Sequence, residues 1–242
     1  MNELEVTPPS AFSATAAATA QRVTSFLQKV YGWMFVGLGI SSAVAIAIAA
    51  SPSTVQTIAR TPALYWGLWI GTFGLAMFIQ ARVEKLSPGT ATVLFVAFSA
   101  LVGAWLSPVL LIYTGASVAT TFVVTAGMFG ALALYGTTTK RSLAGWGQFL
   151  FMGFIGVFLA LLVSAFWKTA ASSAGLQFGI TIIGVIVFTG LAAYHAQQLK
   201  IMAVTVPEDR HAAYAVVGAL SLYITFINLF LMLLRVLGGR RN

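Results

Sequence analysis

Only five acidic side chains occur in this chain, and all of them lie outside its long apolar stretches. Glu3 and Glu5 are close to the N-terminus, Glu84 lies in a short polar segment, and Glu208 and Asp209 form a later one. Acidic residues inside membrane spans are the usual carriers of proton and cation chemistry in helical membrane proteins. Their absence therefore limits the mechanisms open to this chain more than any motif that is present.

The composition predicts an all-α integral membrane protein. Of 242 residues, 59% are hydrophobic and 7% are charged, whereas a soluble domain carries roughly 25% charged residues. The net charge of +8 does not indicate a nucleic-acid partner, because the cations stand one or two at a time between apolar runs, as topology determinants do. The chain has no cysteine, which excludes disulfides and thiolate metal sites.

Seven apolar segments approach the roughly 20 residues that a helix needs to cross the hydrocarbon of a bilayer. Turn-forming pairs such as Ser51-Pro52, Thr61-Pro62 and Ser107-Pro108 separate several of them. The expected spans are Trp33–Ala50, Ala63–Ile79, Thr90–Leu106, Val109–Tyr135, Gly145–Trp167, Gly175–Gln197 and Ala212–Leu237.

Residues 1–21 are rich in Ala, Ser and Thr and show no periodic apolar face, so we predict a disordered N-terminal tail. Residues 22–242 are expected to form a single membrane domain. Because the tail opens with Glu3 and Glu5 rather than a basic segment, the first apolar run is interpreted as an uncleaved span and not as a signal peptide.

The distribution of cations favours a cytoplasmic N-terminus and a C-terminus outside, since basic residues concentrate in cytoplasmic loops. On the opposite side the loops hold Arg60 and Lys168, and three arginines follow near the C-terminus. The cations on the side of the N-terminus are Arg22, Lys29, Arg82, Lys85, Lys140, Arg141, Lys200 and Arg210.

The last predicted span carries polar residues at alternating spacings of four and three, which places them on one helix face. They are Ser221, Thr225 and Asn228, with Met232 and Arg235 continuing the stripe. Lipid cannot satisfy such groups, so the seventh helix is predicted to be surrounded by the others. Two interpretations stay open: hydrogen bonds across helices that aid packing, and the lining of a permeation path.

His195 lies near the end of the sixth span, where an ionisable group is a functional hypothesis by default. The alternative is a neutral imidazole hydrogen-bonded at the membrane interface. His211 is expected to be a solvated loop residue, and two histidines without a nearby acid supply no zinc site. The glycine pairs Gly67/Gly71 and Gly175/Gly179 indicate close helix packing only.

No catalytic element is recognisable in the sequence. The spans contain no interior lysine that could form a retinal Schiff base, and no G-x-S-x-G or HExxH motif occurs. We therefore expect neither an enzyme nor a bound cofactor.

From about Tyr31 to Arg241 the chain resembles the Bax inhibitor-1 (TMBIM) family, and particularly its bacterial branch. Several motifs in the expected order carry this resemblance: Val30-Tyr31-Gly32-Trp33-Met34, Phe122 to Gly130 continuing to Tyr135-Gly136-Thr-Thr-Thr-Lys-Arg141, Ala193-Tyr194-His195-Ala196-Gln197, Leu222 to Phe230, and Leu234 to Gly238. The resemblance implies seven helices with the last one central, a pH-sensitive calcium leak, and, for some bacterial members, partnership with a membrane-anchored AAA+ protease.

The sequence departs from the family pattern at the two positions where the family has a proton-sharing pair of aspartates. His195 and Thr225 stand there instead. A basic latch of the family type would correspond to Arg82 or Lys85, without its acidic partner. Calcium binds roughly six to eight oxygen ligands, usually including carboxylates, so we expect calcium conduction to be weak or absent.

Two functions from different classes follow. The chain is either a Bax-inhibitor-like leak with altered selectivity or gating, or a non-conducting membrane partner of an AAA+ protease. An intramembrane hydrolase is a remote third, since no nucleophile and base pair is recognisable.

Overall fold

The computed structural model describes residues 9–166 and 173–241, and all of the regular elements in these ranges are helical. In chain order the elements are α1 (Pro9–Ala49), α2 (Pro52–Arg60), α3 (Pro62–Ala81), α4 (Pro88–Leu106), α5 (Val109–Ile112), α6 (Gly115–Thr138), α7 (Ala144–Phe166), α9 (Ala174–Thr205), the 3-10 helix η1 (Glu208–Arg210) and α10 (His211–Leu237). Seven of these helical segments are long and apolar enough to cross a membrane, as the sequence predicted. Lys168, assigned to an outer loop from the sequence, lies outside the described residues.

Proline and hydroxyl side chains define where several helices begin. Pro52, Pro62 and Pro88 stand in the first turn of α2, α3 and α4, where the missing N–H costs nothing because it would have no partner inside the helix. The Ser87 hydroxyl accepts a hydrogen bond from the Thr90 N–H at the start of α4, and Thr114 does the same for Ser117 at the start of α6. These caps satisfy backbone groups that helix ends leave free.

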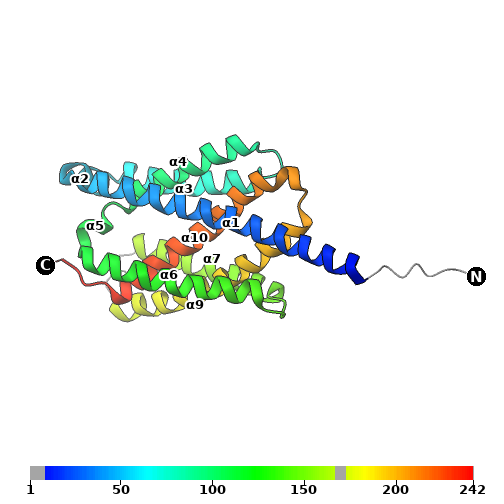
Figure 1. Ribbon diagram of the computed structural model, residues 1–242. Helices are drawn as coiled ribbons and strands as arrows, with labels where there is room; N and C mark the ends of the chain where they lie inside the picture. The colour runs from blue at the N-terminus through cyan, green and yellow to red at the C-terminus, as the bar shows by residue number, and fades with distance from the viewer. Residues whose placement is uncertain (1–8, 167–172, 242) are drawn as a thin grey trace, which may run out of the picture.

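Helix α1 differs from the disordered tail expected through Gln21, because it begins at Pro9. Its first turns are rich in alanine, the strongest helix former. At ~1.5 Å per residue the 41-residue helix is about 60 Å long, which is twice the hydrocarbon thickness of a bilayer. Its N-terminal part therefore projects beyond the bundle (Figure 1).

The segment predicted as one span, Val109–Tyr135, is broken in the structure. Short helix α5 ends at Ile112, and α6 begins at Gly115 after an extended Tyr113. This break is held by the C-terminal segment, because the Thr114 N–H donates to the Gly239 carbonyl and the Arg241 N–H donates to the Ile112 carbonyl. Thus the start of α6 and the end of the chain are fixed to each other.

Helix α10 is the centre of the bundle, as predicted. In its most apolar window 78% of residues are buried, against 17–44% for the other six spans. Helices α1, α3, α4, α6 and α9 pack on it, while α7 packs on α9. The core therefore follows the length of α10 from His211 to Leu234.

The helices around α10 form two groups (Figure 1). One consists of α1 to α4, which pack on each other in the pairs α1–α4, α3–α4, α1–α2 and α2–α3. The other consists of α6, α7 and α9, in which α9 packs on both α6 and α7. The two groups meet through α10 and through a contact between α1 and α9.

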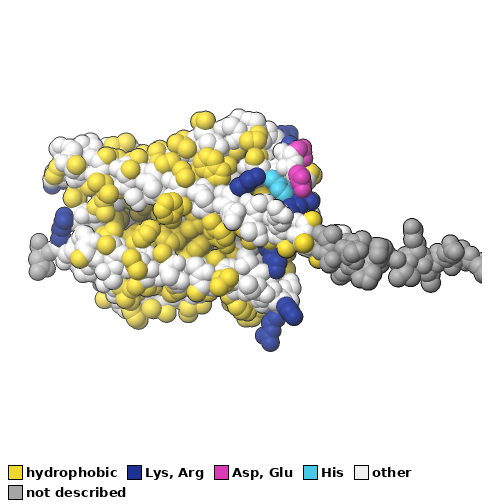
Figure 2. Space-filling view, viewed as in Figure 1, with side chains coloured by type: hydrophobic (Ala, Val, Ile, Leu, Met, Phe, Trp, Pro, Cys, Tyr) yellow, Lys and Arg dark blue, Asp and Glu magenta, His cyan; other side chains and the backbone are white. Residues whose placement is uncertain are grey.

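The outer surface is apolar, which is the reverse of a soluble protein. Large side chains such as Phe35, Val123, Phe149, Met152 and Ile186 are each more than 60% exposed. Figure 2 shows apolar side chains over the length of the bundle, with charged groups at its two ends. A soluble monomer rarely exposes so large an apolar area, so this surface faces lipid.

Two glycines allow helix backbones to approach each other closely. A Cβ at Gly136 of α6 would collide with the Ala193 carbonyl oxygen of α9, and one at Gly103 of α4 would press on the Ser41 carbonyl oxygen of α1. By contrast, a Cβ at Gly67, Gly71, Gly175 or Gly179 would meet nothing. The prediction of close packing at those glycine pairs is therefore wrong. Their spacing shows that the two glycines share a helix face, but it does not show that this face is buried.

We predict that Gly136→Ala destabilises the fold. Alanine favours a helix over glycine by about 1 kcal/mol, but forcing a methyl group against a backbone oxygen costs about 1–3 kcal/mol, and backbone cannot move aside as a side chain can. The thermal unfolding midpoint in detergent should fall.

Gly130→Ala in the same helix is the matched control, because a Cβ at Gly130 meets no atom within 4 Å. Its midpoint should stay unchanged or rise. Equal behaviour of the two variants would contradict the close approach of α6 and α9.

Candidate functional site

His195 of α9 and Thr225 of α10 face each other at the centre of the molecule. His195 Nδ1 lies 3.0 Å from Thr225 Oγ1, and Thr225 is 2% exposed. The structure therefore brings together the two residues that the family resemblance places at the positions of an acid pair. His195 and Thr225 form a hydrogen bond as neutral groups, whereas two carboxylates at the same distance would have to share a proton.

The hydrogen-bond pattern assigns the proton of the imidazole. The Thr225 hydroxyl also lies 2.9 Å from the Ser221 carbonyl oxygen, which can only accept. Since a hydroxyl has one proton, both contacts are satisfied when Thr225 donates to Ser221 and His195 donates from Nδ1. Nε2 of a neutral His195 is then left as a hydrogen-bond and proton acceptor.

A cavity of about 200 Å³ reaches His195 from the end of the bundle where the N-terminus lies. Gln80 and Val83 of the α3 end, Gln198 of α9, and Tyr214 and Ser221 of α10 contribute to its wall. Amide, phenol and hydroxyl groups in this wall can bind water, which an apolar cavity of this size would exclude. The His195–Thr225 contact therefore closes the inner end of a partly polar cavity.

The side chains of Ser221 and Asn228, which also belong to the α10 stripe, form hydrogen bonds within their own helix. The Asn228 amide donates to the Ile224 carbonyl oxygen at 2.8 Å, and the Ser221 hydroxyl to that of Val217 at 3.5 Å. Among the three candidates, only Thr225 has a described side-chain contact to another helix, so packing through hydrogen bonds across helices applies to Thr225 alone. Ser221 lines the cavity.

Arg82 and Lys85 are not brought to the His195–Thr225 pair. Both are exposed in the segment that joins α3 to α4, and the Arg82 guanidinium lies over the Phe78 ring at 6.0 Å. Their neighbours Gln80 and Val83 line the cavity, whereas Arg82 and Lys85 do not. The two cations stand at the rim of the cavity, where they add positive charge without a described contact to His195 or Thr225.

The cavity offers little to a divalent cation. Its wall, as described, contains no carboxylate, and the described residues contain no group of three or more His, Asp or Glu side chains that could hold a metal ion. Neutral oxygens and an imidazole are poor ligands for calcium. A charged His195 would make the wall cationic and repel calcium further.

A second polar contact on α10, which sequence reasoning missed, involves Tyr223. Its fully buried hydroxyl hydrogen-bonds to Ser41 of α1, and the Ser41 hydroxyl also lies 2.7 Å from the Ser99 carbonyl oxygen of α4. Because the Ser41 proton is directed to backbone carbonyls, Tyr223 is the donor to Ser41. This contact ties α10 to the α1–α4 group, as Thr225 ties it to α9.

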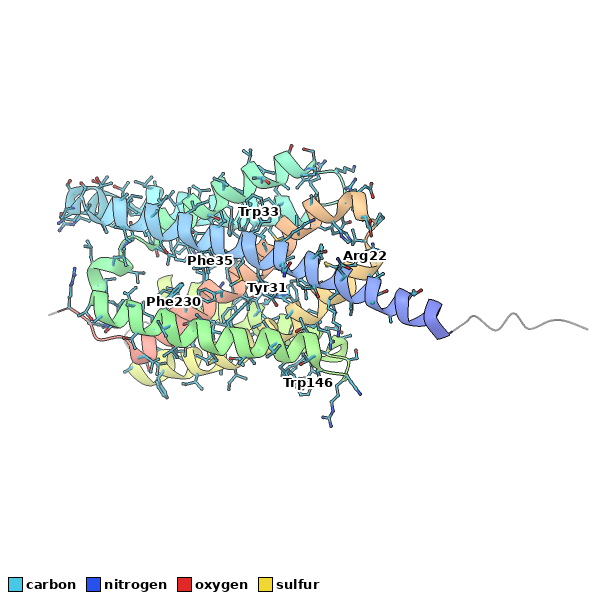
Figure 3. The ribbon with its side chains drawn as sticks, viewed as in Figure 1. Arg22, Tyr31, Trp33, Phe35, Trp146 and Phe230 are labelled. Atoms are coloured by element: carbon cyan, nitrogen blue, oxygen red, sulfur yellow. The ribbon has the colours of Figure 1, made fainter. Side chains whose placement is uncertain are left out.

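His211 is buried rather than solvated, contrary to the sequence expectation. It opens α10, is 7% exposed, and packs edge-on against Phe26. Arg22 of α1, labelled in Figure 3, donates to the Val206 carbonyl oxygen at 2.6 Å and lies 3.7 Å from Glu208. His211 Nε2 is 3.1 Å from the same carbonyl oxygen, so α1 closes over the turn between α9 and α10.

A further clamp at the same end is formed by Arg210. Its guanidinium donates to the carbonyl oxygens of Val83 and Glu84 in the segment between α3 and α4. Gln197 of α9 holds the segment between α6 and α7 in the same way, since its amide accepts from the Leu143 N–H at 2.7 Å and donates to the Arg141 carbonyl at 2.9 Å. These links fix the rim around the cavity.

Together, seven apolar spans, a buried last helix and a polar contact between the sixth and seventh spans define a multi-pass α-helical membrane protein with a closed central polar site. The comparisons with known proteins agree with this class. Residues 23–242 match the family model described as inhibitor of apoptosis-promoting Bax1.

Relatives from several bacteria are similar over nearly their whole length. Inner membrane protein YbhL of Escherichia coli is 47% identical over 221 residues, which cover 90% of this chain and 92% of the relative. A protein of Borreliella burgdorferi is 42% identical, with 90% and 93% covered, and one of Caulobacter vibrioides is 42% identical, with 90% and 89% covered. The chain belongs to the Bax inhibitor-1 family.

Proposed function

We propose that this inner-membrane protein forms a gated leak pathway that enters through the cavity below His195 and is closed by the His195–Thr225 contact. The observation that carries this proposal is the 3.0 Å contact between Nδ1 and Oγ1 at the inner end of a partly polar cavity. Lipid cannot satisfy the hydrogen bonds of an imidazole and a hydroxyl, so such a pair is stable at membrane depth only inside protein or beside a water-filled cavity.

The described conformation is closed. Beyond Thr225 along α10, Phe226, Leu229 and Phe230 are buried, and Phe226 packs edge-on against Phe122 and Phe129 of α6. An apolar segment of this kind stops ions because it offers no substitute for their hydration. Opening therefore requires a movement of α10 relative to α9 and α6, with loss of the His195–Thr225 hydrogen bond.

The chemistry of the His195–Thr225 contact predicts low calcium conduction. A neutral His195 presents no negative charge, and a protonated one presents a positive charge beside the pathway. Acid conditions therefore oppose calcium entry through this pair. A pair of carboxylates follows the opposite logic, since it attracts divalent cations when ionised and loses that attraction as it takes up protons.

We predict that wild-type protein shows little calcium uptake into proteoliposomes between pH 5 and 8. The double substitution His195→Asp with Thr225→Asp should raise uptake at least tenfold at pH 8 and lose most of the gain at pH 5. The measurement is the fluorescence of a calcium indicator trapped inside the vesicles.

The matched control is His195→Asn with Thr225→Asn, which has the same side-chain size without the charge. Uptake should stay at the wild-type level. Equal uptake by the Asn and Asp pairs would show that loosened packing, and not charge, admits calcium. Robust wild-type uptake that neither pair alters would place permeation elsewhere.

We also propose that the N-terminal end of the bundle faces the cytoplasm. The supporting observation is that Arg22, Arg82, Lys140, Lys200 and Arg210 belong to segments that the clamps at this end hold together. Basic residues concentrate on the cytoplasmic side. The opposite end carries Arg60 and the arginines near the C-terminus.

This orientation can be tested directly because the chain has no native cysteine. Cysteine at Gln56, exposed on α2 at the end where the C-terminus lies, should react with an impermeant maleimide added to intact spheroplasts. Cysteine at exposed Lys140 should react only after lysis. The reverse pattern would overturn the orientation.

A non-conducting role as partner of a membrane-anchored AAA+ protease is the second candidate. One observation favours it: α1 projects beyond the bundle, and residues 15–21 are exposed along it. The exposed side chains of residues 16–21 offer a helical surface on which another protein can dock. The family resemblance supplies the class of partner.

Deletion of residues 2–20 separates the two candidates. The deletion should leave the unfolding midpoint unchanged, because the side chains of residues 16–20 are exposed and their removal uncovers no buried surface. Affinity purification from cross-linked membranes should recover the protease with the full chain and lose it with the deletion. Absence of the protease from both samples would contradict the partner role, whatever the flux assays show.

A further inference from the structure

A lateral groove opens on the opposite half of the molecule, between the two helix groups. It has a volume of about 140 Å³ and lies between α1 and α6, with α10 as its floor. Leu38 and Ile46 come from α1, Val118 and Phe122 from α6, and Phe226 and Phe230 from α10. Figure 2 shows this hollow as an apolar surface, and Figure 3 places Phe230 within it.

The groove is apolar apart from Ser41 and Ser42, and the Ser41 hydroxyl is already engaged by Tyr223 and by backbone carbonyls. An apolar cavity of about 150 Å³ stays dry and admits a small hydrocarbon such as a six-carbon ring. Its size matches one segment of an acyl chain. A second helix, about 10 Å across, would not enter it.

Positive charge stands at the outer end of this groove. The C-terminal segment pairs with residues 112–114 beside α5, through an antiparallel bridge between Tyr113 and Arg240. The Arg241 guanidinium lies 3.5 Å from the carbonyl oxygen of Leu110, a residue of the groove wall. Both arginine side chains are exposed.

No acid balances these arginines in the described structure. The three described acidic residues, Glu84, Glu208 and Asp209, all lie in the segments between α3 and α4 and between α9 and α10, at the other end of the bundle. A bidentate guanidinium suits a phosphate group, and each cation close to an anionic membrane surface adds appreciable attraction. The positive charge of the two arginines and the apolar groove beside them therefore match a ligand with an anionic head and an apolar tail.

We propose that this groove and the Arg240–Arg241 pair form a binding site for an anionic phospholipid. One acyl chain lies between α1 and α6 against Phe230, and the phosphate contacts the two guanidinium groups. The site lies on the half of the molecule opposite to the His195 cavity, and it shares Phe122, Phe226 and Phe230 with the apolar segment beyond Thr225.

The test is native mass spectrometry of the purified full chain in detergent, titrated with dioleoyl phosphatidylglycerol or dioleoyl phosphatidylcholine. The two lipids share their acyl chains and differ in headgroup charge. Phosphatidylglycerol should bind about tenfold more tightly, and the preference should shrink as salt is raised. Equal affinities would overturn the proposal.

Four variants separate the parts of the site. Arg240→Gln with Arg241→Gln should abolish the preference, whereas Arg60→Gln, which removes an exposed cation from α2 at the same end, should retain it. Ser42→Phe fills the groove and should weaken binding of both lipids. If Ser42→Phe does not fold, Ile46→Trp replaces it. Ile46 is a 62% exposed residue of the groove wall, and the larger side chain should likewise weaken binding of both lipids.

Three outcomes would contradict the site even if phosphatidylglycerol binds. Loss of the preference in Arg60→Gln to the same degree as in the double arginine variant would indicate diffuse surface charge. Unchanged binding by both groove variants, or a mass spectrum dominated by dimers that Ser42→Phe dissociates, would show that lipid does not occupy the groove.

Discussion

The fold depends on hydrogen bonds that fix the central helix to both helix groups. Hydrocarbon supplies no water to satisfy a polar group, so each buried hydroxyl or imidazole must find its partner inside the protein. Most hydroxyls in the spans solve this within their own helix, as Thr125 does with the Thr121 carbonyl oxygen. Tyr223 and Thr225 instead reach Ser41 and His195 on other helices. Two residues apart on α10, they hold it against α1 on one side and α9 on the other.

This arrangement divides the molecule into two halves that differ in their polar contacts. The clamps made by Arg22, Gln197 and Arg210 tie the loops together at the N-terminal end, where the polar cavity opens. At the other end α1 and α6 stand apart, and the C-terminal segment joins α5 to α6. The proposed ion pathway therefore opens at one end, and the proposed phospholipid site lies at the other.

Much of the fold could be predicted from the sequence because hydrocarbon imposes simple rules on it. Seven apolar segments of sufficient length predicted seven spans, and the polar stripe on the last segment predicted that this helix is buried. The closeness of His195 and Thr225 came from the family resemblance. Contacts that depend on how one helix face meets another, such as Ser41 with Tyr223 or Gly136 with Ala193, leave no periodic signal. His211 was misjudged for a related reason: its charged sequence neighbours suggested solvent, whereas α1 covers it in three dimensions.

The central position of α10 has a consequence for biosynthesis. Ribosomes add roughly 5–20 residues per second, so about ten to forty seconds separate completion of α1 from completion of α10. Throughout that time Ser41 lacks its partner Tyr223, and His195, once α9 has been made, lacks Thr225 until α10 is complete. The earlier spans must therefore wait in the membrane, in loose association or shielded by the insertion machinery, until the last helix enters between them. A ribosome that stalls before α10 leaves spans without a core, a form that membrane quality control can distinguish from the finished protein by its unpaired polar groups.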